Sequence, residues 1–178
     1  FTGYGEGFDL EAAPTRLQAL IMFIRVLGEE EQALAWSGTT PFKDIEKGSQ
    51  AEHYVGYAYE KGYTNGYTAT SFKPAGAVNA YQYTEFVLRA MGYSSAANKD
   101  LSDTLLRAVN AGVLTDGDAA MLQSAAFLRA QLVYISYYAL EADLPDGSQS
   151  LADRLMDLGV FTRDEWRGSW KLVKSDRL

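Results

Sequence analysis

The chain has 178 residues, of which 47% are hydrophobic and 13% aromatic, a composition that excludes intrinsic disorder and can supply a buried core. Its 23 acidic and 16 basic residues give a net charge of −7, which argues against nucleic acid as a partner, since nucleic-acid binding relies on clustered Lys and Arg. With no cysteine and one histidine, the sequence excludes disulfides, thiolate nucleophiles and multi-histidine metal sites, and we expect no cofactor.

The two ends and the apolar runs give no sign of a membrane segment. The opening residues FTGYGEGFDL have neither a basic region nor an apolar stretch, so we expect any secretion signal to be absent or already removed. The most apolar run, residues 17–27, contains Gln18 and Arg25 and is shorter than the ~20 residues of a membrane-spanning helix. The sequence therefore predicts no membrane span.

One class of predicted helix ends in a glycine after a strong helical pattern of apolar residues. Residues 15–28 and 79–92 share this pattern and the same length, and Gly28 and Gly92 stand where a helix commonly ends. Residues 131–141 carry a weaker copy without the glycine. These three segments are predicted to be related helices.

A second class of predicted helix precedes a glycine turn. The sequence predicts such helices over residues 51–61, 101–111 and 151–158, followed by Gly62, Gly112 and Gly159. A hairpin-like loop is predicted over residues 66–74 and a short helix over 29–36. The acidic stretch 116–118 is predicted to be a turn, and the residues after Trp166 are left unassigned.

The order of these elements predicts a repeat protein. We expect a single compact, mainly α domain over residues 1–178, with helix-loop-helix repeats at 42–92 and 100–141. Residues 1–28 are predicted to be the second half of a further repeat, and residues 151–162 its first half. The two ends would then complete one repeat and close a pseudo-threefold bundle.

The first turn of each helix of the first class contains a tetrad with a physical role of its own. Thr15 with Gln18, and Asn79 with Gln82, are predicted to form capping boxes, in which each side chain satisfies a backbone N–H of the other residue. Leu128 has no acceptor in its side chain, so the third helix is expected to begin elsewhere, at Ser124.

Arg16 is placed unfavourably, because the start of a helix already carries about half a positive charge. Backbone N–H groups, the helix dipole and a guanidinium together suit a carboxylate or phosphate. One interpretation of Arg16 and Arg129 is therefore an anion site. The other is that both arginines pair with acidic groups on the protein's own surface.

Several short motifs in this order resemble the S-layer homology domain, a module that usually occurs in threes and attaches bacterial proteins to cell-wall polysaccharide. The motifs are FKDI at 42–45, GYTNGY at 62–67, SFKP at 71–74 and EFVLRAMG at 85–92, with weaker copies at 7–9, 14–16, 25–28, 111–114 and 129–130. The family's T-R-A-E tetrad is altered: the three tetrads here read TRLQ, NAYQ and LRAQ, so all lack the acid and two keep the arginine.

The resemblance implies noncovalent anchoring of a secreted envelope protein to the bacterial cell wall or S-layer. The implied partner is an acidic, often pyruvylated, sugar of a wall polysaccharide, held in grooves between repeats. Carried over to this sequence, the motifs and the aromatic residues beside them give these candidate ligand-binding residues: Thr15, Arg16, Gly66, Tyr67, Asn79, Gln82 and Arg129.

Two other functions stay open at this point. The altered tetrads favour a degenerate repeat scaffold that binds another envelope protein or spaces domains, without glycan binding. An enzyme is not expected, because no pair of carboxylates stands out and no GxSxG, P-loop or Rossmann glycine motif occurs. Trp36 and Trp166 can serve either as packing anchors or as sugar platforms, and the sequence does not decide between these roles.

Overall fold

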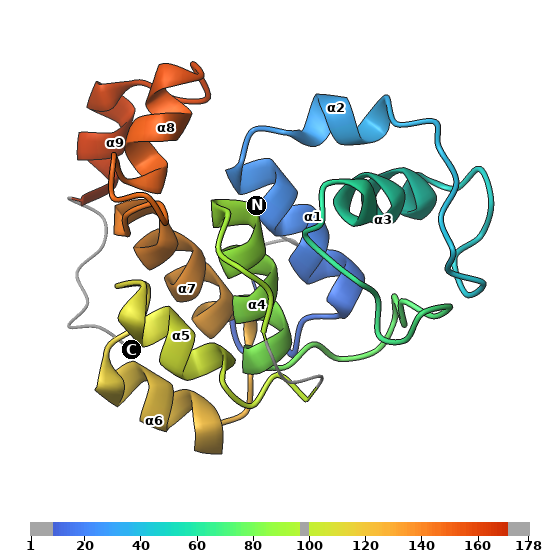
Figure 1. Cartoon of the computed structure of the whole chain (residues 1–178), viewed down its shortest axis with the longest axis horizontal. Helices are drawn as coiled ribbons and strands as arrows, with labels where there is room; N and C mark the ends of the chain where they lie inside the picture. The colour runs from blue at the N-terminus through green and yellow to red at the C-terminus, as the bar shows by residue number, and fades with distance from the viewer. Residues whose placement is uncertain (1–8, 97–99, 171–178) are drawn as a thin grey trace.

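The structure is a computed structural model that describes residues 9–96 and 100–170, and within these residues it is mainly helical (Figure 1). The first four helices are α1 Arg16–Val26, α2 Glu30–Leu34, α3 Gln50–Glu60 and α4 Ala80–Met91. The remaining helices of the described chain are α5 Thr104–Asn110, α6 Asp116–Ser124, α7 Arg129–Glu141, α8 Leu151–Asp157 and α9 Arg163–Trp170. The predicted mainly α fold is confirmed.

The helices that form the centre of the fold begin and end largely as their sequences predict. Thr15 caps α1 in a capping box with Gln18, and Asn79 caps α4 by accepting from the backbone N–H of Gln82. Gly92 ends α4 with φ of 98°, in the left-handed region that favours glycine.

The predicted start of the third helix was wrong. Helix α7 begins at Arg129 with Leu128 as its N-cap, whereas Ser124 is the last residue of α6. The Leu128 side chain accepts no hydrogen bond, but the side chain of Gln131 accepts from the Leu128 backbone N–H at 2.9 Å. Half of a capping box is therefore enough to begin this helix.

Two helices lie where the sequence analysis expected none. The acidic stretch 116–118, predicted to be a turn, is the first turn of α6, where Asp118 and Thr115 form a capping box. Helix α9 begins at Arg163 and extends into the unassigned tail after Trp166, and its start has the same reciprocal bonds between Thr162 and Glu165. Both helices were missed because a Thr-x-x-acid pattern without a long apolar run behind it gives only a weak helix signal.

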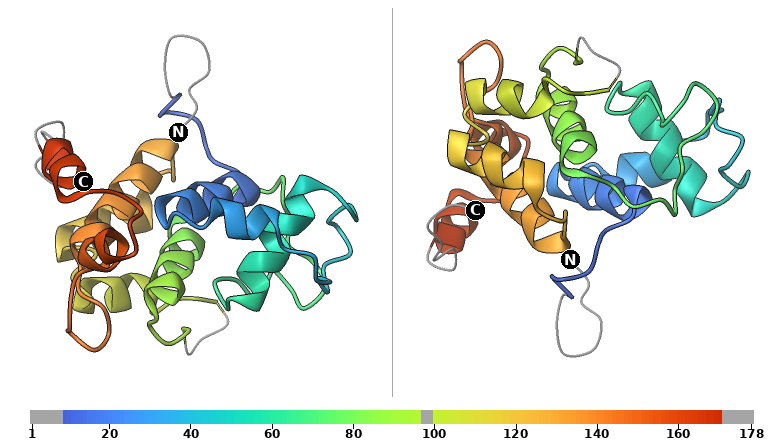
Figure 2. Two further views of the ribbon diagram at one scale, coloured as in Figure 1. Left: turned by 90° about the horizontal axis from the view of Figure 1, so that it is seen from above. Right: turned by 90° about the horizontal axis from the view of Figure 1, so that it is seen from below.

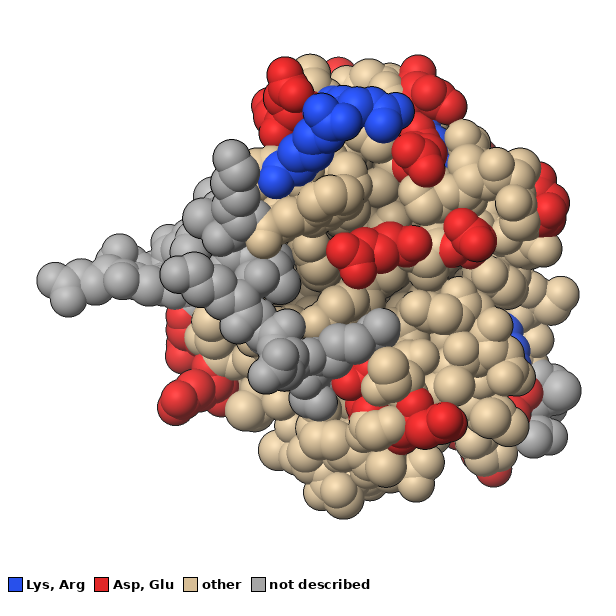
Figure 3. Space-filling model, turned by 90° about the vertical axis from the view of Figure 1, so that its left-hand side faces the viewer, with Lys and Arg blue, Asp and Glu red and all other residues tan. Residues whose placement is uncertain are grey.

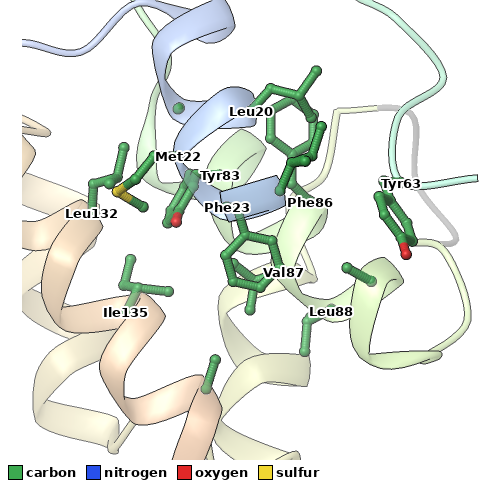
Figure 4. Close-up of a cluster of buried hydrophobic side chains, with 14 of the residues drawn as sticks. Leu20, Met22, Phe23, Tyr63, Tyr83, Phe86, Val87, Leu88, Leu132 and Ile135 are labelled. Carbon is green, nitrogen blue, oxygen red and sulfur yellow. The ribbon is translucent and has the colours of Figure 1, made fainter. Parts of the chain in front are cut away.

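The core lies where the three central helices α1, α4 and α7 meet. These helices contact one another pairwise, and large side chains from all three fill the space between them (Figure 4). Phe23 of α1 packs edge-on against Tyr83 of α4, with ring centroids 6.1 Å apart. The buried Tyr83 hydroxyl in turn hydrogen-bonds Ser136 of α7 at 2.5 Å.

A further helix packs on each of the three central helices. Helix α3 packs on α1, α5 on α4 and α8 on α7, as the views in Figure 2 allow the reader to follow. Beyond α8, Val160 lies against Gly28, which follows α1. A Cβ added at Gly28 would lie 2.6 Å from the Val160 side chain. Residues 1–8 lie outside the described chain, so the joining of the two ends into one repeat, and the threefold symmetry, stay predictions.

Candidate functional site

A cavity of about 800 Å³ lies between the start of α1, the loop 64–69 and one face of α4. Residues 95–96 and 100–101, which follow α4, line its other side. Five of the seven predicted ligand-binding residues line this one cavity: Arg16, Gly66, Tyr67, Asn79 and Gln82. Arg16 and Asn79, which are 63 positions apart in the chain, are thus brought together by the packing of α1 on α4.

The Arg16 side chain is buried although it carries a charge; only 3% of the residue is exposed. Its Nε donates to the carbonyl oxygen of Phe72 at 2.7 Å, and its guanidinium carbon lies 4.9 Å from the centre of the Phe72 ring. Its Nη2 is buried and has no hydrogen-bond partner. Burial lowers the pKa of Arg16 to about 10, partly opposed by Tyr67 and Asp44, so the group is a cation at neutral pH.

Gln82 contributes a second buried polar atom without a partner. The predicted return bond from Gln82 to Asn79 is absent from the hydrogen bonds of the described chain, and the Gln82 Oε1 is buried with no partner. Only the other half of the predicted capping box forms, from the Gln82 N–H to the Asn79 side chain at 2.9 Å. The cavity wall therefore holds one unused donor, on Arg16, and one unused acceptor, on Gln82.

The loop that lines the cavity depends on Gly66. This residue has φ of +82°, and an added Cβ would lie 2.3 Å from the Phe42 ring and 2.6 Å from the Thr68 carbonyl oxygen. Tyr67, the next residue, is 50% exposed, and its ring centre lies 5.8 Å from the Arg16 guanidinium carbon and 3.7 Å from the Lys73 Nζ. An accessible aromatic ring thus stands beside two cations.

Asp44, from the FKDI motif, fixes the end of this loop. Its carboxylate accepts from the backbone N–H groups of Phe72 and Lys73 at 2.9 and 2.8 Å and from the Ser71 hydroxyl at 2.7 Å. Burial alone would raise the pKa of Asp44, but these hydrogen bonds outweigh it and lower the pKa below its ordinary value.

The far part of the cavity contains a charged cluster that the sequence analysis missed. Glu85 of α4 is only 2% exposed, and its carboxylate accepts from Arg89 Nε and Arg107 Nη1, both at 2.8 Å. It also accepts from the Ala96 N–H at 2.8 Å and the Thr104 hydroxyl at 3.0 Å. Burial alone would raise the pKa of Glu85, but these donors and the two guanidinium charges lower it.

A signal for this cluster is present in the sequence. Positions 82, 85, 86 and 89 follow the i, i+3, i+4, i+7 spacing of a single helix face, and the pair Glu85 and Arg89 has the i, i+4 spacing of a helical ion pair. The partner Arg107 lies 22 residues from Glu85 in sequence, so local spacing could not have found it.

The other two predicted residues, Thr15 and Arg129, lie outside this cavity. Thr15 only caps α1. Arg129 Nη1 lies 3.3 Å from the Asp9 carboxylate, and Nη2 lies 3.4 Å from the Gln18 side-chain oxygen. Arg129 therefore pairs with an acid of the protein itself, which was one of the two interpretations of these arginines. Arg16 forms no such pair within the described residues.

Arg16 and Arg129 nevertheless occupy matching backbone positions. The N–H groups of Arg16 and the next residue donate to the carbonyls of Gly76 and Pro74, while those of Arg129 and the next residue donate to Ala12 and Leu10. In this correspondence Asp9 takes the place of Lys73, and both have positive φ, 46° and 57°. An acid thus stands near Arg129 where a base stands near Arg16.

The two tryptophans singled out in the sequence lie away from the Arg16 cavity. Trp36 donates from Nε1 to Glu60 at 2.7 Å and packs over Gly56. Trp166 packs on Tyr137 and Phe161 and also lines a second cavity of about 460 Å³ between α7, α8 and α9. In Figure 3 the basic side chains of this side of the molecule gather at its upper edge, with acidic side chains around them.

The described residues contain neither a metal-binding cluster nor a membrane-spanning helix. They contain no group of three or more His, Asp or Glu side chains placed to hold a metal ion. Within the same residues, no helix combines the length and the apolar character needed to cross a bilayer.

Comparison with known proteins places this geometry in a family context. Residues 41–79 match the family model of the S-layer homology domain. A cell surface protein of Thermoanaerobacter kivui is 29% identical over 170 residues, which cover 89% of this chain and 21% of that protein. The chain therefore spans about a fifth of the length of this relative. No solved structure matches the chain significantly. The match confirms the S-layer homology resemblance that the motifs predict, and it covers the stretch that supplies the loop and Asn79 of the cavity.

Proposed function

We propose that this chain anchors a larger envelope protein noncovalently to the bacterial cell wall, by binding an acidic sugar group of a wall polysaccharide in the Arg16 cavity. The S-layer homology match and the similarity to a protein named cell surface protein support a place at the cell surface. The proposal involves no catalytic step and no cofactor.

The buried Arg16 guanidinium is the observation that carries this proposal. Removing a cation from water is costly unless an opposite charge or several hydrogen bonds compensate it. Here the nitrogen Nη2 is left without a partner, and none of the ion pairs of the described chain includes Arg16. A carboxylate in the cavity would supply both the missing charge and the missing acceptor.

The part of the cavity around Tyr67 and Gln82 suits the uncharged parts of a sugar. The exposed face of Tyr67 can pack against the C–H face of a pyranose ring. The free Gln82 Oε1 can accept a hydrogen bond from a sugar hydroxyl or amide. One cation, one aromatic face and one or two amide groups around a cavity of this size are typical of a site that fixes the orientation of a small polar ligand.

Replacing Arg16 tests the proposal directly. We expect Arg16→Ala to weaken binding of purified wall polysaccharide by about 1.5–3 kcal/mol, or roughly 10- to 100-fold, because a charge-assisted hydrogen bond is lost. Isothermal titration calorimetry measures this change. The matched control is Arg129→Ala, since Arg129 lies outside the cavity; its affinity should equal that of the unaltered protein. An Arg16→Ala variant that folds and binds with undiminished affinity would remove Arg16 from the mechanism.

A protein-binding scaffold without glycan binding is the second candidate function. The altered tetrads and the pairing of Arg129 with Asp9 favour it, because both reduce the number of grooves with a free arginine. Co-sedimentation with protein-free cell-wall sacculi separates the two functions. The anchoring function predicts that the chain pellets with the sacculi, and the scaffold predicts that it stays in solution.

A further inference from the structure

The Arg16 cavity is longer than one sugar-acid site requires. Gln82, Glu85, Phe86 and Arg89 of α4 all line it, so it follows α4 over seven residues. At 1.5 Å per residue this is about 10 Å along the helix axis. Asn79 and Gln82 lie toward the N-terminal end of this face, and Arg89 lies toward its C-terminal end. The Arg16 guanidinium carbon lies between them, 5.5 Å from the centre of the Phe86 ring.

Arg89 presents a guanidinium that its protein partners use only in part. The side chain is 11% exposed, and its Nε donates to Glu85 Oε1 at 2.8 Å. No hydrogen bond from its Nη1 or Nη2 occurs within the described residues. Glu85 thus holds one edge of the guanidinium and leaves the other edge for a further acceptor.

The charges around Glu85 do not balance. Its single carboxylate is shared by Arg89 and Arg107, and its remaining acceptor capacity is used by the Ala96 N–H and the Thr104 hydroxyl. This largely buried cluster therefore carries a net charge of about +1, since arginine stays protonated. Asp100 also lines the cavity, but it is exposed and accepts from the Ser102 N–H.

We propose that Arg89 forms a second anion subsite, so that the cavity binds two consecutive acidic units of a polysaccharide rather than one. The inference rests on the proposed function: Arg16 binds the acidic group of one unit, and Arg89 binds that of its neighbour. Glu85 is a positioning residue, because it orients Arg89 without contacting the ligand. The repeated anionic group of a polymer matches two separate cations that line one cavity.

Two probes of different length test the inference by calorimetry. One is a pyruvylated hexosamine monosaccharide with a single carboxylate, and the other is a disaccharide in which each ring carries a carboxylate. The unaltered protein should bind the disaccharide at least about 10-fold more tightly. Arg89→Gln should remove this gain and leave the affinity for the monosaccharide within about twofold, whereas Arg89→Lys should keep part of the gain because it keeps the charge.

Arg107→Gln is the matched control, because Arg107 is the other partner of Glu85 but does not line the cavity. It should keep most of the disaccharide gain, because it leaves the Arg89 guanidinium at the cavity although it lowers the net charge of the cluster by one. The inference is overturned if Arg89→Gln weakens both probes equally, if Arg107→Gln removes the gain as Arg89→Gln does, or if the unaltered protein binds both probes equally. Binding of the monosaccharide with no gain for the disaccharide overturns the second subsite alone. Absence of binding to either probe overturns the proposed function as well.

Discussion

At the scale of single residues, Asp44 shows how a motif outside the cavity controls its shape. The carboxylate accepts hydrogen bonds from three consecutive residues, 71–73, and so fixes the end of the loop on which Tyr67 and Gly66 stand. One of these residues, Lys73, has φ of 57°, a conformation that is unfavourable for a residue with a Cβ. The hydrogen bonds from its neighbours help to hold it there.

Asp44→Asn is therefore expected to destabilise the protein by about 0.5–1 kcal/mol at pH 7, because an amide has only one acceptor oxygen and no charge, while solvent around the exposed carboxylate weakens the charged bonds that are lost. The pKa of Asp44 is lowered in the folded state. Its contribution to stability is thus present above the unfolded-state pKa of about 3.9 and is lost as the pH falls through the lower folded-state value. Urea unfolding at pH 7 and at pH 3 should show the difference between the two proteins shrinking at the lower pH.

The matched control for this prediction is Asp157→Asn. Asp157 is exposed at the end of α8, and its side chain makes no hydrogen bond within the described residues. Its replacement should change stability by no more than about 0.5 kcal/mol at either pH. A difference between Asp44→Asn and the unaltered protein that stays constant from pH 7 to pH 3 would contradict the assigned role of the carboxylate.

At the scale of helices, the starts of α1, α4 and α7 differ in completeness. Thr15 forms a full capping box, Asn79 accepts one hydrogen bond, and Leu128 accepts none. Leu128 already has the extended backbone of an N-cap, with φ of −111° and ψ of 168°, and Gln131 already makes the return bond. The missing part is an acceptor on the side chain of residue 128.

Leu128→Thr should supply this acceptor and stabilise the protein by about 0.5–1 kcal/mol, the usual effect of a good N-cap after subtraction of the partly buried apolar contact. Thr15→Ala should have the opposite effect of about 1 kcal/mol, because it removes the cap of α1. Thermal and urea unfolding measure both. A destabilised Leu128→Thr variant would mean that the apolar contacts of Leu128 matter more than the cap.

The sequence indicates most helices, but not all of their details. Glycines such as Gly28 and Gly92 mark helix ends because their positive φ is a local requirement. Helix α6 was missed because the sequence Asp116-Gly117-Asp118 is also typical of a turn. Local preference is ambiguous there, and packing of α6 against α5 decides the outcome.

The cavity could be predicted from the sequence only in part. Arg16 drew attention through its unfavourable place in the first turn of a helix, which is a local property. Its burial against Phe72, 56 residues away, and the pairing of Glu85 with Arg107 depend on how α1, α4 and α5 pack. Gln82 shows the same limit. Its spacing from Asn79 predicts a capping bond, but in the structure its side-chain oxygen is at the cavity wall without a partner.

At the scale of the whole molecule, stability depends on how completely the outer helices cover the central three. Leu151, Ala152 and Leu155 of α8 are 1% exposed or less and pack toward α7. Helix α9, by contrast, has no buried residue and contacts the rest mainly through Trp166, which packs on Tyr137 and Phe161. The two C-terminal helices should therefore differ strongly in their contribution.

Two truncated chains test this difference. A chain that ends at Thr162 loses α9 and should be destabilised by only about 1 kcal/mol, which corresponds to the aromatic contacts of Trp166. A chain that ends at Ser150 also loses α8 and exposes the apolar face of α7, so two fully buried leucines predict a loss of about 3–6 kcal/mol. Urea unfolding followed by circular dichroism measures both. Equal losses for the two truncations would show that α9, not α8, completes the core around α7.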